Sequence, residues 1–273
     1  MVFTKEGRDS KMSKKRTVWK IAVLTVLCIL YAGYSIFLSA EEPWQAALIW
    51  NDIGKGNVDA VKKALDKGLD PNSISPIGYP LLQTAVADDH PEIVNLLLKY
   101  GADPKRKGCE WLVETAINND NFELAKLLIK AGAVVRRPAD FCCIWDDPLV
   151  DAVGKNNLEM VNFLLTNGAD ANASGLSFKS ALHSAATLGN IEIMKILLAA
   201  GANINQRDGF GRTALMFACE KGHFAAVEFL LSQGADPNLA TSYGDTALSV
   251  AQKISSPDKD KIIETLQARI KKK

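Results

Sequence analysis

Few side chains of this 273-residue sequence combine the types and spacing that catalysis or metal binding requires. The three histidines lie far apart, at His90, His183 and His223. No two cysteines have the C-x-x-C spacing of a zinc site, and no glycine-rich phosphate-binding loop is present. The acidic pairs at 88–89 and 146–147 have the side chains of acid/base groups or calcium ligands, but aspartate at a turn or helix start is typical of a cap. The sequence therefore predicts no catalytic, cofactor or metal site.

Basic residues are concentrated at the start of the chain. The whole sequence has 32 Lys+Arg and 31 Asp+Glu, a net charge of +1. Positions 1–20 hold seven basic and two acidic side chains, so the rest of the chain carries 25 basic and 29 acidic, a net charge of −4. The 48% of apolar residues exclude wholesale disorder. The near-zero total disfavours nucleic-acid binding, which needs a strongly basic face.

The basic region, residues 1–20, precedes an uncharged and mostly apolar run, residues 21–40, which ends at Glu41. As a helix, this run would rise about 30 Å, enough to cross the hydrocarbon layer of a membrane. It is either an uncleaved transmembrane anchor or a cleaved signal peptide. A start at Met12 in place of Met1 would shorten the basic region to a length typical of signal peptides. Both interpretations keep the basic flank in the cytoplasm, so they predict that residue 41 onward lies outside it.

A repeat of regular period dominates the rest of the sequence. Its first mark is a glycine after an apolar run, at Gly68, Gly101, Gly132, Gly168, Gly201 and Gly234. Its second mark is a small residue, at Ala85, Ala116, Ala152, Ala185, Ala218 and Ala251. Leucine or isoleucine at i, i+3 and i+4 before most of the glycines predicts a helix with one buried face, and the glycine predicts its left-handed cap. The alanines predict a first helix that packs closely against its neighbours.

This pattern resembles the ankyrin repeat, which has a period of about 33 residues and a T-P-L-H-x-A signature. The best matches are Ser180-Ala-Leu-His-Ser-Ala-Ala and Arg212-Thr-Ala-Leu-Met-Phe-Ala. The resemblance covers residues 44–270 and implies an all-α ankyrin-repeat solenoid of about seven helix-turn-helix units with projecting loops. The approximate units are 44–75, 76–107, 108–140, 141–174, 175–207, 208–240 and 241–270. It also gives His183 a structural place at the signature position, and His90 and His223 a place at the start of a second helix.

The resemblance further implies what such a protein does. Ankyrin repeats bind other proteins along a concave surface of loops and first helices, without catalysis. We therefore expect a protein partner, no enzyme activity, no cofactor and no nucleic acid.

Two adjacent loops depart from the repeat. The interval from glycine to alanine is the same in four units, but it is two positions shorter at 101–116 and three positions longer at 132–152. Both loops carry aromatic or arginine side chains of the kind enriched at binding hot spots, namely Arg106, Trp111, Arg136, Arg137, Phe141 and Trp145. One interpretation is that the extra residues fold over an otherwise exposed repeat face. The other is that these six residues bind the partner.

The cysteines after the apolar run raise a related question. Cys219 follows Ala218 and is predicted to be a buried core residue. Cys109 lies in the short loop, and Cys142 and Cys143 lie in the long one. Outside the cytoplasm, a disulfide could join Cys109 to Cys142 or Cys143 and clamp the two loops; unpaired packing cysteines are the other interpretation.

These observations lead to one preferred function and one rival. We expect a non-enzymatic protein-binding module, periplasmic or anchored in the inner membrane through residues 21–40, similar to bacterial periplasmic ankyrin-repeat proteins. Its role is then that of an inhibitor or immunity protein that neutralises a secreted toxin or effector. The rival is a membrane-anchored scaffold that organises or protects an envelope assembly. The partner and the oligomeric state stay open at this point.

Overall fold

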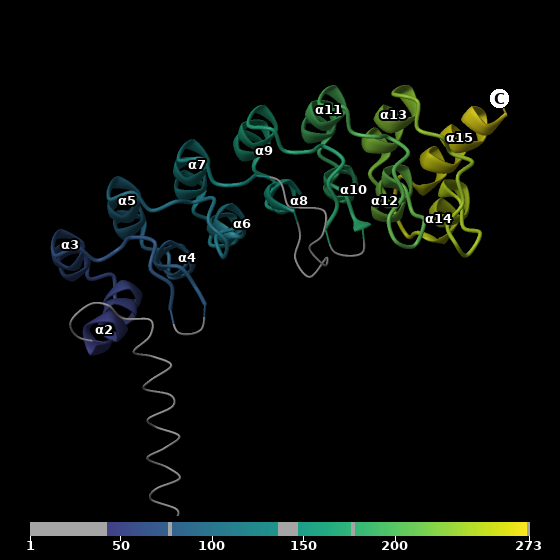
Figure 1. Cartoon of the computed structure of the whole chain (residues 1–273). Helices are drawn as coiled ribbons and strands as arrows, with labels where there is room; N and C mark the ends of the chain where they lie inside the picture. Colours follow the sequence, from purple (N-terminus) through teal and green to yellow (C-terminus); the bar gives the residue numbers. More distant parts are fainter. Residues whose placement is uncertain (1–42, 76–77, 136–146, 176–177, 272–273) are drawn as a thin grey trace, which may run out of the picture. The chain divides into compact units, whose positions relative to one another are not determined.

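The computed structural model describes residues 43–75, 78–135, 147–175 and 178–271. Fourteen α-helices follow one another in these ranges, which confirms the predicted all-α solenoid (Figure 1). The chain divides into two compact units, residues 1–52 and 53–273. The first helix, α2 (Pro43–Gly54), runs from the first unit into the start of the second. The second unit contains α3 (Val58–Asp66), α4 (Leu81–Ala87), α5 (Pro91–Lys99), α6 (Leu112–Asn118), α7 (Phe122–Lys130), α8 (Pro148–Gly154), α9 (Leu158–Thr166), α10 (Ala181–Leu188), α11 (Ile191–Ala199), α12 (Ala214–Lys221), α13 (Phe224–Ser232), α14 (Ala247–Lys253) and α15 (Lys259–Ile270).

The basic region and the membrane-length run lie outside the described residues. In the part of the chain that the structure does describe, no helix is both long enough and apolar enough to span a membrane.

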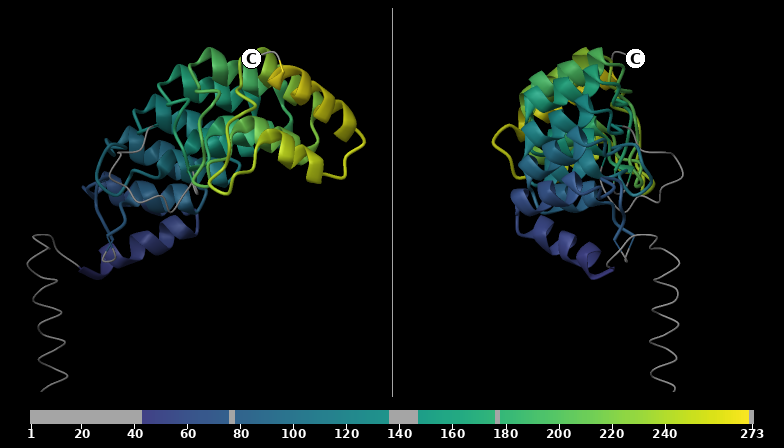
Figure 2. Two further views of the ribbon diagram at one scale, coloured as in Figure 1. Left: turned by 90° about the vertical axis from the view of Figure 1, so that its right-hand side faces the viewer. Right: turned by 60° about the vertical axis from the view of Figure 1, so that its left-hand side comes forward.

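Within residues 53–273 the helices form two layers (Figures 1 and 2). The first layer runs α4, α6, α8, α10, α12, α14, and each of these helices packs against the next. The second layer contains α3, α5, α7, α9, α11, α13 and α15. The predicted alanines lie in the first layer and are completely buried, at Ala85, Ala116, Ala152, Ala185, Ala218 and Ala251. Because a methyl group fills so little space, it lets first-layer backbones approach closely.

The six repeat glycines end the second-layer helices as predicted. Their φ angles lie between 89° and 97°, a left-handed region that glycine enters without a Cβ clash. At Gly101, for example, the Gly101 amide donates to Leu98 O (3.1 Å) and the Ala102 amide donates to Leu97 O (2.9 Å). These bonds satisfy carbonyls at the end of α5 and turn the chain into the next loop.

Asparagine side chains join consecutive units four positions after the repeat glycine. Asn72 donates to Gly101 O (3.1 Å) and accepts from the Asp103 amide (2.8 Å). Asn172 repeats this pair of bonds with Gly201 O (3.0 Å) and the Asn203 amide (2.7 Å). Asn205 accepts from the Asp236 amide (2.9 Å) in the following unit.

The units on either side of α7 are joined differently. The position of Asn72 is occupied after Gly101 by Lys105, whose side chain makes no hydrogen bond within the described residues; its backbone amide donates to Asp103 Oδ1 (2.9 Å). After Gly132 the same position is Arg136, which lies outside those residues. Second-layer helices pack closely at α3–α5, α9–α11, α11–α13 and α13–α15, and less closely on both sides of α7. The first layer stays continuous there, so the sparser contact is confined to the second layer.

The final helix closes the C-terminal end of the unit. It begins after Asp258 and is 12 residues long, against nine for each earlier second-layer helix. Ile262 and Leu266 are buried beneath it, and Arg269 donates to Leu231 O (2.7 Å) at the end of α13. This helix therefore covers the last repeat face, which a solenoid would otherwise leave exposed.

Candidate functional site

Four hairpins lead into first-layer helices with the same pattern of backbone hydrogen bonds. In the hairpin before α4, the Ser75 amide donates to Tyr79 O (2.7 Å). The matching bonds are Gly175 N to Lys179 O (2.9 Å), Asp208 N to Arg212 O (2.9 Å) and Thr241 N to Asp245 O (2.8 Å). The last two pairs lie one repeat period apart, so the tips of these hairpins recur with the repeat.

Each hairpin carries an exposed aromatic side chain. The exposed fractions are 54% for Tyr79, 58% for Phe178, 46% for Phe210 and 81% for Tyr243. Exposed single hydrophobic residues are ordinary, but one aromatic per hairpin on four hairpins is a regular feature. Tyrosine and phenylalanine offer a large contact area with few rotatable bonds, which suits a binding surface. We call these four residues the tip aromatics; Tyr79 occupies the closing position of its hairpin, which is Lys179 or Arg212 in the later units.

Phe178 is held in an unfavourable backbone conformation. Its φ is +57°, a left-handed value that is uncommon for a bulky residue, whereas the same hairpin position is Gly78, Gly211 or Gly244 elsewhere. The left-handed region costs a non-glycine residue about 1–2 kcal/mol. Strain of this kind tends to persist at functional positions, so it supports a binding role for this side chain.

Cationic side chains lie at the base of the tip aromatics in the fifth and sixth units. The Arg212 guanidinium carbon lies 4.3 Å from the ring centre of Phe217 and 5.5 Å from that of Phe210, and Lys179 Nζ lies 5.3 Å from Phe217. Arg212 also pairs with the buried Asp208 (Nε to Oδ2, 2.9 Å). These contacts fix the orientation of this hairpin, so Phe210 is presented by a rigid support.

His183 has a structural role at the signature position. Its Nδ1 accepts from the Ser180 amide (3.0 Å), and its Nε2 faces the carbonyl oxygens of Gln206 (3.0 Å) and Arg212 (3.1 Å). Both of those partners are acceptors, so Nε2 carries the proton and the ring is neutral. Burial lowers the pKa of His183, opposed by the hydrogen bonds to the two carbonyls. The ring thus ties α10 to the next hairpin.

The other candidate groups for chemistry also have structural partners. His90 Nε2 faces Gly54 O (3.3 Å) and His223 Nε2 faces Thr187 O (3.0 Å), and both residues precede a second-layer helix as predicted. Asp89 accepts from Asn121 (2.7 Å), and Asp147 caps α8. In the ranges that the structure describes, no group of three or more His, Cys, Asp or Glu could hold a metal ion.

The predicted hot-spot residues of the short loop are described, and those of the long loop are not. Arg106 is exposed, and Trp111 is half-buried immediately before α6. Within the short loop, the Cys109 amide donates to Arg106 O (2.9 Å) and closes a turn. The remaining predicted residues, Arg136, Arg137, Phe141 and Trp145, lie outside the described residues, so their role stays a prediction.

The structure likewise describes the cysteine of the short loop but not those of the long loop. Cys109 and Cys219 are buried and form no disulfide within the described residues, and Cys219 is in the core as predicted. Burial raises the pKa of Cys219 to about 12, and burial with the nearby Glu110 and Asp103 does the same for Cys109. Cys142 and Cys143 lie outside the described residues, so a disulfide between the two loops stays a prediction.

The tip aromatics were not predicted from the sequence. Phe210 and Tyr243 are one repeat period apart and precede the signature by the same distance, which is a detectable signal. Tyr79 and Phe178 are shifted by one or two positions, so a search at a fixed repeat position misses them. The predicted hot spot lies on the loops whose length departs from the repeat, whereas the tip aromatics lie on hairpins of regular length.

Comparison with known proteins agrees with this geometry. A family model described as ankyrin repeats (3 copies) matches residues 45–139, 138–208 and 182–268. The ankyrin repeat protein FPV222 of fowlpox virus (strain NVSL) is 28% identical over 150 residues. That match covers 52% of this chain and 19% of the viral protein, so the chain spans about a fifth of its relative's length.

Proposed function

The chain belongs to the ankyrin-repeat family, a non-enzymatic fold that binds other proteins, and on that premise we propose that it binds a protein partner through the tip aromatics. The observation that carries this proposal is the recurrence of an exposed aromatic side chain on four hairpins, at Tyr79, Phe178, Phe210 and Tyr243. Rigid aromatic anchors carry much of the binding energy at protein interfaces. The proposed activity is binding alone, without catalysis.

A photo-cross-linker at position 243 would identify the partner, and alanine variants would then measure each contribution. Phe210→Ala and Tyr243→Ala should each weaken binding about tenfold or more, as expected for an anchor residue. Leu188→Ala is a matched control, because Leu188 is also exposed (43%) but lies at the opposite end of α10 from its hairpin. Equal affinities for all three variants and the native chain would contradict the proposal.

Phe178→Gly separates binding from stability. Glycine occupies this left-handed position in the other hairpins, so the variant removes strain and should unfold at an equal or higher urea concentration. It also removes an anchor, so its affinity for the partner should fall about tenfold. A variant that is stabler and binds equally well would show that Phe178 is not part of the surface.

We propose that the repeat domain lies outside the cytoplasm, in the periplasm or tethered to the inner membrane. The support is the basic region 1–20 before the uncharged run 21–40, with Glu41 after it. Sequencing the N-terminus of the mature protein distinguishes the two forms. An N-terminus near residue 41 favours an exported binder, and retention of residues 21–40 favours the anchored scaffold. Protection of the domain from protease in spheroplasts would contradict both.

The finer role that we propose is neutralisation of a secreted toxin or effector. A row of anchors along a solenoid can cover a broad surface of one partner, which is the geometry of an inhibitor. Deletion of the gene should then sensitise cells to toxin-producing competitors, and the tip-aromatic variants should fail to restore protection. Full viability of the deletion strain in that competition would overturn this role.

A further inference from the structure

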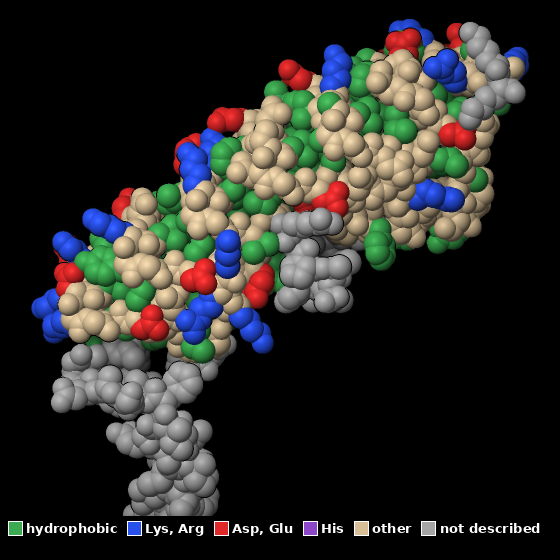
Figure 3. All heavy atoms as spheres, turned by 45° about the horizontal axis from the view of Figure 1, so that its top comes forward, with side chains coloured by type: hydrophobic (Ala, Val, Ile, Leu, Met, Phe, Trp, Pro, Cys, Tyr) green, Lys and Arg blue, Asp and Glu red, His purple; other side chains and the backbone are tan. Residues whose placement is uncertain are grey.

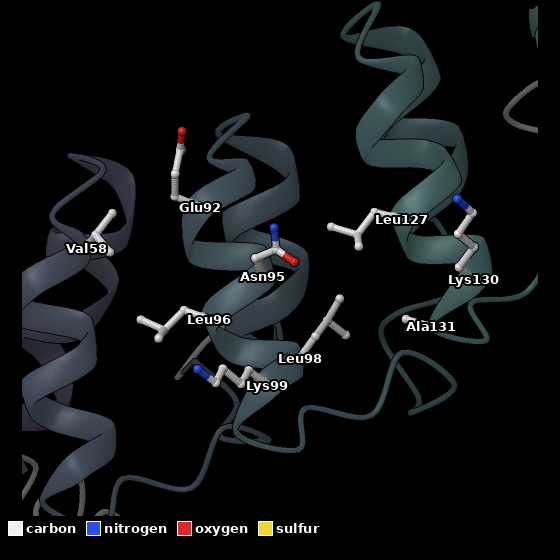
Figure 4. Close-up of a pocket in the computed structure, with 9 residues that line it drawn as sticks. All are labelled: Val58, Glu92, Asn95, Leu96, Leu98, Lys99, Leu127, Lys130 and Ala131. Carbon is white, nitrogen blue, oxygen red and sulfur yellow. The ribbon is translucent and has the colours of Figure 1, made fainter.

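A hollow on the second layer, away from the hairpins, has no part in the proposed partner surface. It has a volume of about 710 Å³ and lies mainly between α5 and α7, with Val58 of α3 at its edge (Figure 4). Its lining consists of Val58, Glu92, Asn95, Leu96, Leu98, Lys99, Leu127, Lys130 and Ala131. Figure 3 shows hydrophobic side chains exposed in patches between charged ones on the surface turned toward the viewer.

The hollow follows from the way the units are joined at this point. α5 and α7 pack less closely than most second-layer neighbours, and the connecting loop has Lys105 in place of the joining asparagine. The side chains of Leu98 and Leu127 therefore project toward the gap and remain half-buried, together with Leu96 (Figure 4). Each leaves apolar surface in contact with water, which a docked helix would cover.

Charges lie at the two ends of this hollow. Lys99 and Lys130 are the last residues of α5 and α7, and Glu92 lies at the opposite end of α5 (Figure 4). All three side chains are exposed, and in the described ranges none of them forms a salt bridge. A segment that fits the hollow needs an apolar side chain for its centre and a carboxylate for the lysine end.

α5 itself carries that complement. Glu92, Leu96 and Lys99 lie on one face of the helix, since they are spaced i, i+4 and i+7. If two α5 helices run antiparallel about an axis between positions 95 and 96, Glu92 of each lies opposite Lys99 of the other. Lys130 then lies near the same carboxylate, and Leu96 of each copy lies opposite Asn95 of the other.

We propose that a second copy of this chain docks in the hollow through α5, giving a two-fold symmetric dimer. The pattern is self-complementary, as a two-fold interface requires. α7 has the same spacing at Glu123, Leu127 and Lys130, but its Glu123 pairs with Lys126 (2.8 Å). On α11 the position of Lys99 is Ala199. The dimer places both hairpin rows outside the contact between copies.

A photo-cross-linker at Asn95 in the full chain, expressed in cells, tests the contact. Asn95 is exposed at the centre of the hollow, and a cross-linked product of two copies is expected, with both peptides assigned by mass spectrometry. Asn162 is the matched control, because it is exposed at the same position of α9, where the Glu–Leu–Lys pattern is absent. No product at 95, or a product with a different protein, would overturn the proposal.

Charge exchange tests the register. Glu92→Lys should weaken self-association about tenfold or more, because it sets three cationic side chains together, and Lys99→Glu should weaken it less, because Lys130 remains. The double variant should recover much of the loss. Sedimentation of the purified full chain over a range of concentrations gives the dissociation constants. Tyr243→Ala should leave them unchanged, so this result is independent of the partner surface. Equal values for all charge variants would overturn the proposal.

Discussion

Consecutive repeat units are joined in two ways, although the helices they connect are similar. One kind of joint lies between α9 and α11, and the other lies on either side of α7. At the first, Asn172 makes two hydrogen bonds into the next unit, and the second-layer helices pack closely. Between α5 and α7, Lys105 replaces the asparagine, and the second-layer helices on both sides of α7 make fewer contacts while the first-layer helices stay packed. At the α5–α7 joint a different loop residue thus accompanies sparser second-layer contact, although the helices keep the same repeat.

The largest effect expected from this difference is a separation of the unfolding transitions. Units of a solenoid are coupled only to their neighbours, so a weak joint lets the two sides unfold independently. All five tryptophans lie at or before position 145, so their fluorescence reports the N-terminal side, while circular dichroism reports every helix. In urea, the fluorescence midpoint should come before the final loss of helix. Coincident transitions would show that the joints are equally strong.

His183→Ala should give the largest single-residue loss in the closely joined region. The ring is 1% exposed and bonds to Gln206 O and Arg212 O of the next unit. Its removal should lower the free energy of unfolding by about 2–4 kcal/mol, from lost hydrogen bonds and a cavity. His90→Ala is the control, since that ring is only partly buried and has one 3.3 Å contact; it should cost less than about 1 kcal/mol. Similar losses for both would contradict this assignment.

Exchanging the joining residues should change stability in opposite directions. Asn172→Ala removes two inter-unit bonds at an exposed site and should cost about 1 kcal/mol. Lys105→Asn introduces the missing side chain and should raise the free energy of unfolding by up to about 1 kcal/mol. Urea titration followed by fluorescence suits the second variant, because the tryptophans lie on that side. If Lys105→Asn gives no gain in stability, the conformation of the loop backbone, and not the side chain at position 105, accounts for the sparser contact between α5 and α7.

The smallest effect is on pH dependence. Burial lowers the pKa of His183 in the folded chain below its unfolded value of about 6.5. Between these two values the unfolded chain binds more protons, so stability falls as the pH drops below about 6.5. The advantage of the native chain over His183→Ala should therefore be smaller at about pH 5.5 than at about pH 7.5. An advantage that grows with acidity would require a charged ring in the folded chain.

The sequence predicted those parts of the fold that depend on local spacing. Each left-handed cap, from Gly68 to Gly234, and each buried alanine depends only on one helix and its turn. A glycine or alanine that recurs with the repeat therefore predicts them. The role of Asn172 depends on a unit stacked beside its own, and the exposure of Phe178 depends on the hairpin that carries it. Those features need three dimensions, so sequence reasoning favoured the irregular loops and missed the regular hairpins.

The sparser second-layer contact beside α7 also has a mechanical consequence. Units connected end to end all carry the same load, so a load applied along the solenoid deforms the most compliant joint most. The joint between α5 and α7 combines a continuous first layer with sparser second-layer contact, so it should bend more easily than the other joints. A pull on the molecule would then change its curvature near its middle while the asparagine-joined units keep their spacing.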